Sequence, residues 1–66
     1  MKIRVIFETK SSSGDQWRES SDVNVLGKSV ETEVNEYLED LFKTWNETAP
    51  KNDKRELVRI IETKEV

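Results

Sequence analysis

The chain has 66 residues, of which 38% are charged and 33% hydrophobic, and its formal net charge is −3. It contains no cysteine and no histidine, which excludes disulfide bonds and metal sites built on thiolate or imidazole ligands. It lacks a run of about 18 apolar residues, so we expect no membrane span. Its start, MKIRVIFETK, has only a short apolar run and no small-residue cleavage pattern, so we expect no signal peptide and a cytoplasmic location. Because the apolar residues are clustered and periodic, the composition favours one small folded domain over residues 1–66.

Two strands are predicted at the start of the chain. Residues 2–9 alternate Ile3, Val5 and Phe7 with charged residues, and only Ile6 places an apolar side chain on the polar face. The next residues, KSSSGD, are typical of a turn in which Gly14 can adopt a positive φ. Residues 17–25 place three apolar side chains in one phase, but their polar centre, ESSD, is that of an edge strand or a partial loop.

The clearest pattern in the chain is an amphipathic helix over about residues 29–49. Eight apolar residues recur at the helical period and fall within an arc of about 140°. These residues are Val30, Val34, Tyr37, Leu38, Leu41, Phe42, Trp45 and Ala49. The hydroxyl of Ser29 can cap the first turn, and Pro50 should end the helix because it disfavours helical geometry in the residue before it.

The last element is predicted to be a strand over residues 56–63. A helix is the alternative, since Leu57, Ile60, Ile61 and Lys64 also recur at helical spacing. The short length of the segment and its β-branched residues favour the strand.

The predicted fold class is α+β, with the order ββαβ and a three-stranded antiparallel sheet in the order 2-1-3. This arrangement puts the most apolar strand in the middle and lets the helix make a right-handed crossover to the last strand. The helix would cover one face of the sheet, with Leu38, Leu41 and Trp45 at the centre of its buried stripe.

The uncovered face of the sheet is the first candidate interface. If the strands alternate regularly, that face carries a mixed apolar and cationic set: Arg4, Ile6, Leu57, Arg59 and Ile61. Contiguous exposed apolar patches mark partner or self-association sites, whereas isolated surface aliphatics are ordinary. The first hypothesis is therefore a non-enzymatic accessory protein that binds another protein, including a second copy of itself as a homodimer, through this face or an edge strand.

The helix supplies a second candidate surface, because it carries one lysine against six acidic residues. Four of the acidic residues form a stripe opposite the apolar one: Glu33, Glu36, Asp40 and Glu47. Glu36 and Asp40 are a like-charge i,i+4 pair and Glu47 opposes the helix dipole, so the stripe is not arranged for helix stability alone. It is either a solvated helix face or an acidic surface for a basic partner, such as an inhibitor that mimics the charge of nucleic acid.

A nucleic-acid-binding module is a further alternative, in which Arg4, Arg59, Lys2 and Arg18 form a basic sheet face. Trp17 would then be a stacking platform, although its position favours a partly buried packing residue at the sheet edge. The net negative charge argues against it. Catalysis is not expected either, because the chain lacks a glycine-rich phosphate loop and any recognisable nucleophile–base spacing, and nothing indicates a cofactor. In its short length and its small number of predicted elements, the chain resembles small accessory proteins encoded by phages and mobile elements.

Overall fold

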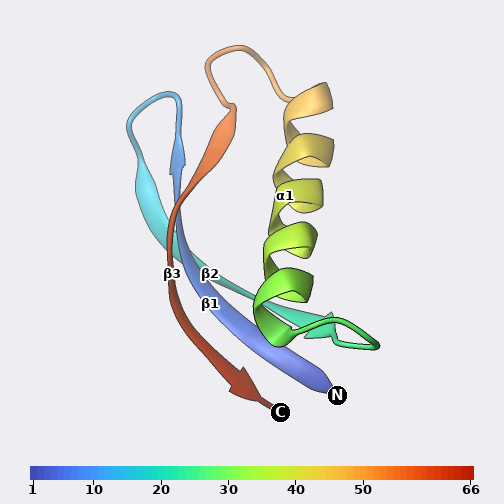
Figure 1. Cartoon of the computed structure of the whole chain (residues 1–66). Helices are drawn as coiled ribbons and strands as arrows, with labels where there is room; N and C mark the ends of the chain where they lie inside the picture. The colour runs from blue at the N-terminus through green and yellow to red at the C-terminus, as the bar shows by residue number, and fades with distance from the viewer.

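The computed structural model describes residues 1–66, and its elements follow the predicted order. They are β1 (Lys2–Ser11), β2 (Gln16–Asn24), α1 (Val30–Thr48) and β3 (Arg55–Glu65). The strands form one antiparallel sheet in the order β2-β1-β3, and α1 lies against one face of it (Figure 1). The α+β fold with ββαβ order is therefore confirmed, and the last segment is a strand rather than a helix.

The β1–β2 hairpin forms where the sequence predicts it. Ile3, Val5 and Phe7 alternate along β1 with less buried residues and face the helix, and Thr9 and Ser11 continue this buried set. Gly14 has φ 100° in the connecting turn, and its N–H donates to the carbonyl of Ser11 at 3.0 Å. The central position of β1 follows from its sequence, because it is the strand with the most continuous apolar face.

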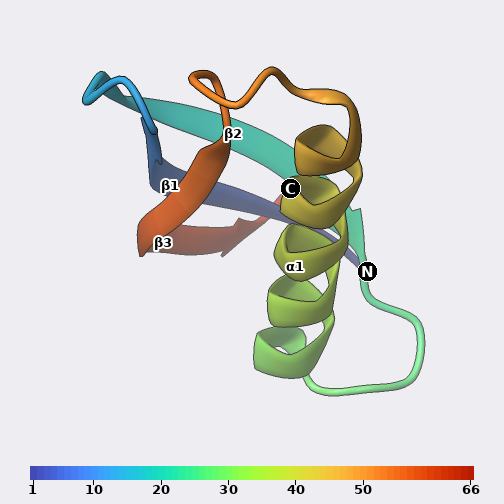
Figure 2. The same ribbon diagram turned by 90° about the horizontal axis from the view of Figure 1, so that it is seen from above.

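Local capping fixes both ends of α1. The hydroxyl of Ser29 accepts a hydrogen bond from the N–H of Thr32 at 3.2 Å, as in a typical N-cap. At the other end the helix stops at Thr48, and the N–H of Ala49 donates to the carbonyl of Trp45 just before Pro50. In the view from above, the helix lies on one side of the curved sheet (Figure 2). Its charge makes α1 too polar to cross a membrane.

The hydrophobic core is off-centre, because it lies between α1 and the first two strands. Its seven buried residues are Ile3, Val5, Phe7, Val23, Val25, Val34 and Leu38. Phe42 packs edge-on against Phe7, with ring centroids 5.9 Å apart and an interplanar angle of 81°. Strand β3 contributes no residue to this core.

One half of the helix stripe is more exposed than its periodicity indicates. Leu38 is 1% exposed, as predicted, but Leu41 and Trp45 are 36% and 40% exposed. The prediction that these two residues lie at the centre of the buried face is therefore wrong. The reason is that they lie opposite Glu19 and Ser21, so the sheet offers them little apolar surface.

Strand β3 departs from regular alternation at two points. Its pairing with β1 shifts between Ile6 and Phe7 and again between Glu8 and Thr9. As a result, Ile60 pairs with Phe7 and Leu57 pairs with Thr9, so both face the helix although they are three residues apart. The prediction that Leu57 lies on the uncovered face is wrong, because it assumed a strand without bulges.

Candidate protein-interaction site

The uncovered face of the sheet carries cross-strand ion pairs rather than a continuous apolar patch. Three pairs cross it between neighbouring strands: Arg4–Asp22 at 3.0 Å, Lys10–Glu56 at 3.2 Å and Arg59–Glu8 at 3.3 Å. The hydrogen bond from Arg4 to Asp22 raises the pKa of the arginine and lowers the pKa of the carboxyl. Arg4 and Arg59 thus already have carboxylate partners, which does not favour phosphate binding by these two side chains, whereas Arg18 lies on the same face without an ion pair.

Three of the five predicted interface residues lie together on this face: Arg4, Ile6 and Arg59. Ile6 is half-buried and lies between Ser20 on β2 and Glu62 on β3, so its apolar surface is not extended by its neighbours across the sheet. Ile61 is half-buried at the first irregularity of β3, where it has no pairing partner on β1. The structure does not bring Leu57 to this face.

The acidic stripe on the back of α1 is partly compensated. The ammonium of Lys28 donates to both carboxylate oxygens of Glu36, at 2.8 and 2.9 Å, and this hydrogen bonding raises the pKa of the lysine. Glu33 is half-buried, while Asp40 and Glu47 are exposed and form no ion pair. No group of three or more carboxylates is arranged to hold a metal ion.

Three of the eight large apolar residues that remain exposed lie close together on β3, which is an edge strand. It pairs only with β1, so the N–H and C=O groups of its other edge have no strand partner. Leu57, Val58 and Ile60 are 38%, 41% and 37% exposed, respectively. The opposite edge of the sheet, β2, is different, because its Val23 is buried and most of its other residues are polar.

The helix-facing residues of β3 are arranged symmetrically about Ile60. Each of them pairs with a buried residue of β1, and a residue lies on the same face of a sheet as its partner. These residues are Arg55, Leu57, Ile60, Thr63 and Glu65. The two flanking pairs lie three and five residues from Ile60 on either side. On the opposite face, Glu56 and Lys64 both lie four residues from Ile60 and carry opposite charges. This symmetry depends on the two irregularities in β3 and could not be recognised from period-two alternation.

A clasp at the start of β3 joins the strand to the C-terminal half of α1. The side-chain amide of Asn46 donates to the carbonyl of Arg55 at 2.7 Å and accepts from its N–H at 2.8 Å. The guanidinium of Arg55 lies between the rings of Trp17 and Trp45, with its carbon 5.0 and 3.7 Å from their centroids. Asn46 thereby occupies the edge of β3 at Arg55 in the way a neighbouring strand would, so the free edge begins at Glu56.

The sequence does not indicate this clasp, although it predicts that Trp17 is partly buried at the sheet edge. Trp17 is half-buried against Arg55, in agreement with that expectation. The contact of Asn46 with Arg55 could not be predicted from the sequence, because a polar residue beside the apolar stripe of a helix does not indicate which partner it binds. Comparison with protein-family models, with curated proteins and with solved structures found no match for the chain.

Proposed function

We propose that the protein is a non-catalytic protein-binding module that acts as a homodimer, in which β3 pairs antiparallel with β3 of a second copy. The observation that carries this proposal is the self-complementary order of β3 about Ile60. A two-fold contact of this kind requires each surface to match itself, which is the property that distinguishes β3 from the other surfaces of the chain.

The pattern of charges on β3 favours a single register. With Ile60 opposite Ile60, Leu57 lies opposite Thr63 on the helix side, and Glu56 lies opposite Lys64 on the other side. A slip of one residue would set helix-facing residues of one copy opposite residues of the other face in the second copy, and a slip of two residues in one direction places Glu56 opposite Glu62, which lies on the same face. Like charges directly opposite each other destabilise a strand pair, so the centred register is preferred.

The rest of the sheet favours a closed pair over an open filament. The polar residues of β2 offer little apolar surface to a further strand, and polar edges are a common protection against edge-to-edge aggregation. On β3 itself, Asn46 ends the free edge at Arg55. The pairing would therefore extend over about residues 56–64 and join two three-stranded sheets into one.

Charge reversal at the paired positions tests this proposal. In the dimer, Lys64→Glu places two glutamates opposite each other at two symmetric points, so we expect self-association to weaken by at least about tenfold. Glu56→Lys should weaken it for the same reason. The double variant Glu56→Lys/Lys64→Glu restores opposite charges and should recover association, as measured by sedimentation at tens to hundreds of micromolar.

Lys51→Glu is the matched control, because it makes the same charge change in the α1–β3 loop, away from the edge of β3. Circular dichroism of each variant would establish that the exposed substitutions leave the fold intact. A wild-type chain that stays monomeric throughout this concentration range would refute the proposal. So would a double variant that associates no better than the two single variants.

A further inference from the structure

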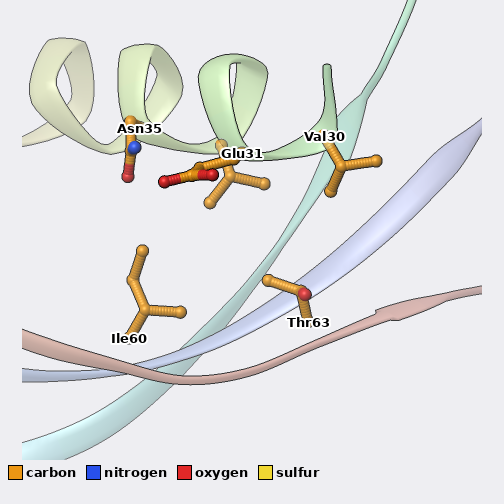
Figure 3. Close-up of a pocket in the computed structure, with 6 residues that line it drawn as sticks. Val30, Glu31, Asn35, Ile60 and Thr63 are labelled. Atoms are coloured by element: carbon orange, nitrogen blue, oxygen red, sulfur yellow. The ribbon is translucent and has the colours of Figure 1, made fainter.

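We infer that the groove between α1 and β3 binds a basic amphipathic segment of another protein. The groove consists of two adjoining hollows of about 380 and 420 Å³, and Asn35 lines both of them. Figure 3 shows the first hollow, where Ile60 and Thr63 point from β3 towards Val30 and Asn35 on the helix. The second hollow continues along the helix towards Phe42 and Leu57.

The floor of the groove is apolar and is not filled by the chain itself. Its apolar lining comes from both elements: Val30, Val34, Leu38 and Phe42 on α1 and Leu57 and Ile60 on β3. Leu57 and Ile60 face the helix yet are still 38% and 37% exposed, so the side chains of α1 do not cover them fully. A ligand with apolar side chains at helical spacing could bury this surface.

The helix side of the groove rim is acidic, and the one cation in the lining, Arg55, is held at the rings of Trp17 and Trp45. Glu31, Asn35 and Glu39 follow one another at intervals of four residues along the helix edge that faces β3. Neither Glu31 nor Glu39 forms an ion pair within the chain, in contrast to Glu36 on the back of the helix. Carboxylates beside an exposed apolar floor are complementary to a segment that carries Lys or Arg on either side of an apolar stripe.

This inference deepens the proposed function by adding the chemistry of a partner, but it does not depend on the dimer, since the groove lies within one chain. In a dimer centred on Ile60, the grooves of the two copies would lie on either side of the two-fold axis. Glu31 of one copy would then lie on the same side of the sheet as Glu39 of the other, which would increase the negative potential around the apolar floor.

The test uses three synthetic peptides of about 15 residues. The first has leucines at i, i+3, i+4 and i+7 and lysines elsewhere, the second has the same composition with the leucines scrambled, and the third replaces the lysines with glutamates. We expect only the first peptide to bind and to shift the methyl NMR signals of Leu57 and Ile60. Equal binding of the scrambled peptide, or shifts only outside the groove, would overturn the inference.

Charge variants of the helix locate the binding surface. Glu31→Lys/Glu39→Lys should weaken binding of the first peptide by about tenfold or more at low salt, and less at high salt. The matched control is Asp40→Lys/Glu47→Lys, which makes the same charge change on the back of the same helix and should alter affinity less than about twofold. A larger effect of the back variant would overturn the groove site and favour the acidic stripe instead.

The Lys64→Glu variant separates the two proposals. Its substituted side chain lies on the opposite face of β3 from the groove, so peptide binding at Leu57 and Ile60 should persist in it. Loss of self-association with retained peptide binding would be expected if both proposals hold. A wild-type chain that never associates but binds the first peptide would refute only the dimer, and a dimer without peptide binding would refute only the groove.

Discussion

The side-chain amide of Asn46 joins the C-terminal half of α1 to the first residue of β3. It satisfies both backbone groups of Arg55 at the first position of β3, where no strand lies alongside. The contact also connects the helix to the strand that contributes nothing to the main core. An asparagine suits this position because its side chain presents one acceptor and one donor, the same pair that a neighbouring backbone would provide.

Asn46→Ala should destabilise the protein by about 1–3 kcal/mol, because it leaves a partly buried N–H and C=O of Arg55 without partners. The matched control is Asn35→Ala, on the same edge of the helix, whose side chain makes no hydrogen bond within the chain. That change should be neutral or stabilise by a few tenths of a kcal/mol, since alanine is the better helix former. Urea unfolding of the two variants measures the difference, and equal effects would show that the clasp contributes no stability.

The residues that could be predicted from sequence are those whose roles depend on near neighbours. Ser29 caps a helix that begins at the next residue, and Gly14 lies in a four-residue connection between two paired strands. Asn46 and Arg55 are nine residues apart, and their contact depends on the path of the loop between them and on the position of the helix over the sheet. No local pattern encodes that geometry.

At the level of the elements, the sequence predicts whether each segment is a helix or a strand. It does not predict for every residue which face of the sheet the side chain lies on. Helix α1 and strand β1 have long, uniform periods, so their buried faces were largely evident. Strand β3 resets its alternation twice, which moves Leu57 to the helix side and leaves Ile61 unpaired. A bulge depends on how two strands fit together, so it has no signature in the alternation of a single strand.

The hairpin turn allows a test in which only backbone conformation differs between two sites. A Cβ atom added at Gly14 or at Gly27 would have open space around it, but only Gly14 has a positive φ. Gly14→Ala should therefore destabilise by about 1–2 kcal/mol, since L-residues disfavour that region. Gly27→Ala should be neutral or stabilise by about 0.4–1 kcal/mol, because it restricts the unfolded chain. Thermal unfolding compares the two, and equal effects would contradict this account of the turn.

The whole molecule is a small core with an adjoining strand that the core does not bury. Seven residues from β1, β2, α1 and the segment after β2 make up the core, while β3 is held by its pairing with β1 and by the clasp at Arg55. A domain of this size buries only about 60% of its unfolded surface. Association through β3 would add buried area where the single chain has least.

If the native state is the dimer, its stability must depend on protein concentration. We expect the free energy of unfolding to rise by about 1.4 kcal/mol of dimer for each tenfold increase in concentration. The Lys64→Glu variant should show a much weaker dependence at the same concentrations. Denaturation at a series of concentrations measures this dependence, and a wild-type midpoint that does not move would contradict a dimeric native state.

The clasp also determines which part of the protein is observed by intrinsic tryptophan fluorescence. Both tryptophans of the chain flank Arg55, so intrinsic fluorescence samples one junction, where the hairpin, the end of α1 and the start of β3 meet. An optical signal confined to this junction follows the opening of the clasp. Methyl signals from Ile60 or Leu57 are needed to observe the middle of β3, and coincidence of the two kinds of signal during unfolding would identify the chain as a single cooperative unit.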